Sequence, residues 1–109
     1  MIRLSGVGCI KMASKAIPSL AKITTDDARK LVHDFIYNTN GSPVDEVTAI
    51  PYFAPKSYSG EEMVEIICHG GYMASQMIIR LLVSSGARIA EPGEFTKRAF
   101  LNGRISLSQ

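Results

Sequence analysis

The chain has 109 residues, of which 46% are hydrophobic and 20% are charged. This size and mixture predict one globular domain with an ordinary core and exclude an intrinsically disordered chain. The net charge is only +2 and no basic block occurs, so charge alone does not predict nucleic-acid binding.

Residues 2–4 predict a strand that ends at Ser5 and Gly6. Ser5 is expected to be the N-cap of a helix that runs through Ile17, because apolar residues follow it at helical spacing. Pro18 should end or interrupt this helix, since a proline cannot continue the helical hydrogen-bond ladder.

A β-hairpin is predicted in the middle of the chain. Residues 31–37 and 44–53 both have strand-like patterns, and residues 38–43 between them are rich in turn formers. The connecting loop is longer than the minimal two-residue hairpin turn.

The second half predicts a strand, a helix, a short strand and a short helix. Residues 63–69 form the strand, and residues 87–90 and 92–100 are the later short strand and helix. The long helix between them begins at the Gly70-Gly71 turn and ends before Gly86. Two neighbouring stripes predict that it is well buried: Met73, Met77 and Leu81, and Ala74, Ile78 and Leu82. The order of elements favours an α+β fold, a mixed β-sheet with helices packed on one face.

The most informative residue is Glu65, a carboxylate inside the apolar strand at residues 63–69. Alternation puts Val64 and Ile66 on one face of this strand and Glu65 with Ile67 on the other. Both faces are largely apolar, which predicts a central strand that is covered on both sides. A charge in that position is costly unless a partner compensates it.

Two arginines are candidates for a shared site with Glu65. Arg3 lies in an apolar strand, and Arg104 follows the Asn102-Gly103 turn. The three charges predict either a ligand pocket or an internal salt bridge between Glu65 and one arginine, and the residues alone favour neither. Lys97 and Arg98 are expected to form a solvated helix face.

Other combinations of reactive residues carry little weight. Cys68 and His69 are strand neighbours and point to opposite faces, so a thiol–imidazole pair is not expected. No spacing of cysteine and histidine predicts a metal site. The Gly70-Gly71 turn could offer backbone N–H groups to an anion, but a tight strand-to-helix turn is the favoured interpretation.

The cysteines and the apolar runs of the sequence indicate the cellular compartment of the protein. Cys9 and Cys68 lie far apart in apolar surroundings, which indicates reduced thiols, with a disulfide as the alternative. No apolar run is long enough for a membrane span, and no signal-peptide pattern opens the chain, so a cytoplasmic protein is expected.

The second half of the sequence resembles a known family closely. The similar segments are SYSGEEMVE at residues 57–65, HGG at 69–71, GAR at 86–88 and EPGEFTKRAFLNGR at 91–104. The long last segment is specific, while Arg3-Leu4-Ser5-Gly6 fits more loosely. The chain resembles, over nearly its whole length, the N-terminal domains of the MnmE (TrmE) family of tRNA modification GTPases.

This resemblance implies a domain, residues 1–109, that binds 5-formyl-tetrahydrofolate or a related reduced folate and forms a homodimer. It implies a parent protein that acts on the wobble uridine of tRNA together with an MnmG-type flavoprotein. The family's folate contacts carry over to Arg3, Glu65 and Arg104, and Tyr58 could line the pocket. At the last position the family commonly has lysine, and arginine keeps the charge but changes its geometry.

Family members begin earlier, with a further strand, and continue into helical and GTPase domains. We therefore expect this chain to lack the sites for GTP, magnesium and potassium and not to be catalytic alone. The low net charge predicts at most a weak, salt-sensitive association of this chain with tRNA. The alternative to folate binding is a dimerisation scaffold that has lost the folate site with the first strand.

The chemistry of a pterin suits a buried carboxylate. A pterin carries a ring N–H beside an exocyclic amino group, and a carboxylate can accept both in charge-assisted hydrogen bonds. Glu65 is the residue predicted to do so, because two donors would offset the cost of its burial.

Overall fold

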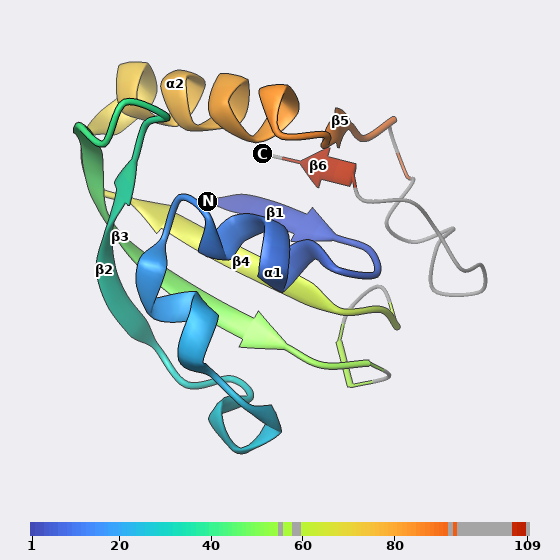
Figure 1. Ribbon diagram of the computed structural model, residues 1–109. Helices are drawn as coiled ribbons and strands as arrows, with labels where there is room; N and C mark the ends of the chain where they lie inside the picture. Colours follow the sequence, from blue (N-terminus) through green and yellow to red (C-terminus); the bar gives the residue numbers. More distant parts are fainter. Residues whose placement is uncertain (55, 58–59, 92, 94–105, 109) are drawn as a thin grey trace.

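The computed structural model describes residues 1–54, 56–57, 60–91, 93 and 106–108. Figure 1 shows a twisted β-sheet with helices on one side. The predicted α+β fold with a mixed sheet is therefore confirmed. In the described part of the chain, no helix is both long enough and apolar enough to cross a membrane.

Six strands form the sheet in the order β2-β3-β4-β1-β6-β5. Their bounds are β1 Ile2–Ser5, β2 Val32–Tyr37, β3 Pro43–Tyr52, β4 Met63–Cys68, β5 Arg88–Ile89 and β6 Ser106–Ser108. Neighbouring strands are antiparallel except for the parallel pair of β5 and β6. The edges of this sheet are β2 and β5, so β1 lies inside it with β4 on one side and β6 on the other.

The helices differ from the prediction near the N-terminus. The first helix, α1, spans Cys9–Ser14, and its N-cap is Gly8 in the left-handed conformation at φ 84°. Ser5 instead ends β1, is fully buried and donates its hydroxyl to Glu61. The prediction of a Ser5 cap was therefore wrong. The helix also stops before Ile17, and Pro18 begins the 3₁₀ helix η1, Pro18–Lys22.

The later elements follow the prediction more closely. The predicted hairpin is confirmed as β2 and β3, the long helix as α2, Gly71–Ser84, and the short strand as β5. A second 3₁₀ helix, η2, spans Thr25–Asp27. Strand β6 was not predicted, and the helix predicted at residues 92–100 lies outside the described residues.

One face of the sheet carries the core. Ile2, Leu4 and Ile66 project from β1 and β4 into a buried cluster that includes side chains of α1, η1 and α2. In α2 only one of the two predicted stripes is buried: Ala74, Ile78 and Leu82 are covered, whereas Met73 and Met77 are exposed. The prediction of a well-buried helix therefore holds for one stripe alone.

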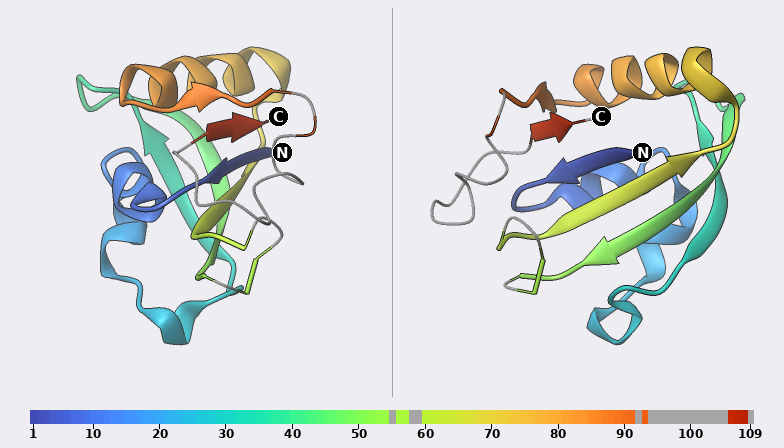
Figure 2. Two further views of the ribbon diagram at one scale, coloured as in Figure 1. Left: turned by 90° about the vertical axis from the view of Figure 1, so that its right-hand side faces the viewer. Right: turned by 180° about the vertical axis from the view of Figure 1, so that it is seen from behind.

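The opposite face of the sheet carries no described helix; it is open around Phe35 and Ile67, whereas Ser5 and Met63, at the start of β4, are buried. Figure 2 shows it from behind, with β3 and β4 nearest the viewer and α1 on the far side. Cross-strand partners share a face, so the register places Arg3, Glu65 and Ile50 in one row on this side. Ile67 is 37% exposed here, so β4 is central, as predicted, but no described helix covers its second face.

Candidate functional site

The candidate site lies on the open face of the sheet, where β1, β4 and β3 run side by side. Arg3 stands directly opposite Glu65, and Glu65 directly opposite Ile50. Tyr52 is two residues beyond Ile50 on β3, so it is a diagonal neighbour of Glu65. The strand register alone therefore brings a guanidinium, a carboxylate and a phenol together.

Glu65 is the centre of this group. Its Oε2 accepts hydrogen bonds from Arg3 Nη2 at 2.8 Å and Arg3 Nε at 3.2 Å, and its Oε1 accepts from the Tyr52 hydroxyl at 2.7 Å. The side chains of Arg3 and Glu65 are 27% and 12% exposed. The internal salt bridge predicted as one of two alternatives is thus present, and the pair still reaches the surface.

The ionisation of Tyr52 reflects this environment. Burial raises the pKa of the Tyr52 phenol, and the hydrogen bond to Glu65 and the negative charge of Glu65 raise it further. The cations Arg29 and Arg3 oppose this shift and lower the pKa. The phenol is therefore held in its protonated form, the form that can donate to Glu65.

Two of the four predicted site residues lie outside the described residues, namely Tyr58 and Arg104. The structure brings together the other two, Arg3 and Glu65. Tyr52 was not predicted as a site residue. Its chemistry depends on the register between β3 and β4, and no local pattern in the sequence reveals that register.

Two further carboxylates, Glu61 and Glu62, lie in the segment just before β4. Glu61 is 5% exposed and accepts a hydrogen bond from the buried Ser5 hydroxyl. Glu62 Oε2 accepts from the backbone N–H of Ile10 at 2.7 Å, in the first turn of α1. These contacts fasten the segment before β4 to the first helix.

The thiol of Cys9 is buried in the core. Burial raises the pKa of Cys9 far above its usual range, and the charges of Glu62 and Glu61 add to the effect. Burial also raises the pKa of Cys68, with a further contribution from Asp45. Both cysteines are free, as predicted, and both pKa shifts disfavour the reactive thiolate.

The Gly70-Gly71 turn is bound at its start by a carboxylate of a neighbouring strand. Asp45 Oδ2 accepts from the N–H groups of both His69 and Gly70, each at 2.9 Å. The start of α2 is therefore already occupied by a carboxylate from β3, which agrees with the favoured interpretation of a structural turn.

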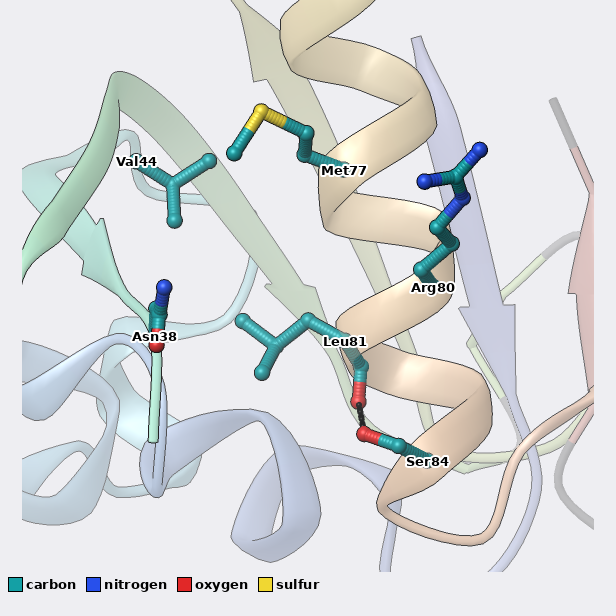
Figure 3. A pocket seen from close by; sticks show the side chains of 6 residues that line it. All are labelled: Asn38, Val44, Met77, Arg80, Leu81 and Ser84. Carbon is teal, nitrogen blue, oxygen red and sulfur yellow. Dashed lines mark hydrogen bonds between the residues drawn. The ribbon is translucent and has the colours of Figure 1, made fainter. Parts of the chain in front are cut away.

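An open groove of about 290 Å³ lies elsewhere, between α2 and the β2–β3 hairpin (Figure 3). Met77, Arg80, Leu81 and Ser84 line it from α2, and Asn38 and Val44 line it from the hairpin. No predicted site residue lines this groove. Among the described residues, no group of three His, Cys, Asp or Glu side chains could hold a metal ion.

Comparison with known proteins agrees with the resemblance noted in the sequence. A family model described as "GTP-binding protein TrmE N-terminus" matches residues 1–104. A protein of Thermotoga maritima named tRNA modification GTPase MnmE is 48% identical over 108 residues, which are 99% of this chain and 23% of the relative.

Two further relatives come from other lineages. The protein of the same name from Carboxydothermus hydrogenoformans is 46% identical over 112 residues, covering 100% of this chain and 24% of the relative. A probable tRNA modification GTPase MnmE of Cyanidioschyzon merolae is 40% identical over 109 residues, with the same coverage. The chain spans about a quarter of the length of these relatives. It belongs to the family described as GTP-binding protein TrmE N-terminus.

Proposed function

We propose that this chain is a binding module for a reduced folate of the 5-formyl-tetrahydrofolate type, and that Glu65 holds the amino edge of the pterin. The observation that carries the proposal is the Glu65 carboxylate on the open sheet face, supplied with donors by Arg3 and Tyr52 and still 12% exposed. Such a carboxylate remains accessible to a ligand with N–H donors.

Arg3 has two parts in this proposal. It compensates the charge of Glu65 in the absence of a ligand, which removes the cost of an isolated buried carboxylate. When the ligand is bound, its guanidinium lies beside the carboxylate that holds the pterin, within reach of the ring carbonyl or the carried formyl group. Tyr58 and Arg104 are proposed as further contacts on the strength of the family resemblance.

We propose in addition that the module forms a homodimer and serves a tRNA-modifying GTPase that works with an MnmG-type flavoprotein. The names of the relatives support the link to tRNA modification. Exposed apolar side chains on the open sheet face, Phe35 at 43% and Ile67 at 37%, support the dimer. A scaffold that dimerises without folate is the alternative function.

The test is a calorimetric titration of 5-formyl-tetrahydrofolate into the wild-type chain and into Glu65→Gln. We expect saturable micromolar binding to the wild type and an affinity about 10- to 100-fold lower for Glu65→Gln, since the ligand loses its charge-assisted hydrogen bond to the carboxylate. The control is Glu46→Gln, which makes the same change of charge at an exposed position on the neighbouring strand β3.

The fold of Glu65→Gln has to be checked by its thermal melt, because the variant leaves Arg3 without its carboxylate. The loss of stability should be about 1–3 kcal/mol. Equal affinity of wild type and Glu65→Gln would refute the role of Glu65. An absence of saturable binding to the wild type would leave the scaffold as the better description.

A further inference from the structure

The two oxygens of the Glu65 carboxylate are used unequally. Both N–H groups that Arg3 contributes go to Oε2, whereas Oε1 receives the Tyr52 hydroxyl alone. A carboxylate oxygen accepts about two hydrogen bonds. Among the described residues, Oε2 is therefore saturated and Oε1 has one acceptor position left.

The Tyr52 oxygen provides a second acceptor next to that position. A phenol has one proton, and Tyr52 directs it to Glu65 Oε1 at 2.7 Å. The lone pairs of the Tyr52 oxygen are then available to another donor. Glu65 Oε1 and Tyr52 Oη thus form two neighbouring acceptors from adjacent strands.

The amino edge of a pterin has the complementary arrangement. Its ring N–H and its exocyclic amino group are attached to the same carbon and present two donors side by side. While Arg3 keeps both of its bonds to Oε2, the carboxylate cannot accept both of these donors in the usual bidentate way. The ligand then needs a second acceptor beside Oε1, and Tyr52 Oη is in that place.

We propose that Tyr52 contacts the ligand directly, its phenol oxygen accepting from the exocyclic amino group while Glu65 Oε1 accepts from the ring N–H. This inference rests on the proposed folate function and makes Tyr52 a specificity residue of the same site. With this contact the site distinguishes 2-amino heterocycles from isosteric rings that lack the amino group, because only the former donate to both Glu65 Oε1 and Tyr52 Oη.

The test uses two quinazoline analogues of folate that differ only in carrying an amino or a methyl group at position 2. Calorimetry measures both with the wild-type chain and with Tyr52→Phe, which keeps the ring and removes the hydroxyl. We expect Tyr52→Phe to bind the amino analogue about 5- to 10-fold more weakly and the methyl analogue nearly as well as the wild type does. Tyr72→Phe, at an exposed position on α2, is the matched control.

The outcomes separate this inference from the proposed function. An equal loss for both analogues in Tyr52→Phe would mean that Tyr52 acts only by orienting Glu65, and the inference alone would fail. Unchanged affinities in Tyr52→Phe would refute it as well. If the wild type binds neither analogue nor 5-formyl-tetrahydrofolate, the folate function fails and the inference fails with it.

A second measurement uses only the wild-type chain and does not depend on the folding of a variant. An N–H donated to the phenol oxygen stabilises the phenolate and lowers its pKa. The pKa of Tyr52, followed by carbon NMR of labelled tyrosine, should therefore be lower in the complex with the amino analogue than in the complex with the methyl analogue. Identical values in the two complexes would contradict direct contact.

Discussion

At the scale of single residues, the site depends on one carboxylate with partners from two neighbouring strands. Arg3 and Tyr52 approach Glu65 from opposite sides because β4 lies between β1 and β3. Arg3 compensates the charge, and Tyr52 fixes the second oxygen. A lone buried carboxylate would be costly, so these contacts explain how an acidic residue is tolerated in this strand.

The pKa of Tyr52 gives a direct measure of this contact. Burial and Glu65 raise it above 10, the value of the free side chain. Glu65→Gln removes the negative charge and should lower the pKa of Tyr52, whereas Arg29→Ala removes an opposing cation and should raise it. Carbon NMR of labelled tyrosine across alkaline pH measures both, and the signals of the other tyrosines serve as references.

The same shift has a consequence for stability. A raised pKa means that the folded chain keeps the Tyr52 proton at a pH where the unfolded chain has lost it. This contribution to stability is complete below pH 10 and is lost as the pH rises through the pKa of the folded state.

An unchanged Tyr52 pKa in Glu65→Gln would show that the two side chains do not interact in solution.

The sequence revealed part of this site. Arg3 and Glu65 stand out because each is a charge in an apolar strand, and such positions require a partner. Their pairing remained one of two alternatives, because the sequence does not state which strands are neighbours. Tyr52 could not be identified, since an aromatic residue at the end of a strand is ordinary until the register places it beside Glu65.

At the scale of elements, a carboxylate from one strand holds the start of the long helix. Asp45 on β3 accepts from the backbone N–H groups of His69 and Gly70. A Cβ on Gly70 would lie 2.8 Å from the Cβ of Ala74 and 3.0 Å from Asp45 Oδ1. The close approach of strand, turn and helix therefore requires glycine at this position.

Replacing Asp45 should destabilise the fold without touching the candidate site. Asp45→Asn keeps the shape of the side chain but removes the negative charge at the N-terminus of α2, at a cost of about 0.5–2 kcal/mol. Urea denaturation measures the free energy of unfolding, with Glu46→Gln as the control that changes charge on the same strand. Equal stabilities of the two variants would contradict this role of Asp45.

Local patterns predicted some elements and not others for a physical reason. The hairpin and α2 are specified by their own turn residues and periodicity. The start of α1 is different, because it depends on the left-handed Gly8 and on Glu62, which is distant in sequence and binds the N–H of Ile10. The apolar periodicity of α2 also could not show which of its two stripes packs against the core.

At the scale of the whole molecule, one sheet face is covered by helices and the other is partly open. The helices and the core occupy one side, and the candidate site lies on the other together with exposed apolar side chains. A second copy that packed on this face would bury Phe35 and Ile67 close to the candidate site. The same face of the sheet would then both bind the ligand and form the dimer interface.

A polar substitution on this face should weaken the dimer. Ile67→Ser removes an exposed apolar side chain from the open face and should shift sedimentation velocity profiles towards the monomer, with a dimer dissociation constant about tenfold higher. The control for a general loss of apolar surface is Met73→Ser, because Met73 is 71% exposed on α2. A wild-type chain that sediments as a monomer would contradict the proposed dimer, and an unchanged dimer in Ile67→Ser would exclude this face as its interface.

The most direct test of the proposed folate function is a crystal structure of the chain in complex with 5-formyl-tetrahydrofolate. We expect the pterin on the open sheet face, with a ring N–H within hydrogen-bond distance of the Glu65 carboxylate and Arg3 still beside it. A ligand bound elsewhere, with Glu65 still held only by Arg3 and Tyr52, would contradict it.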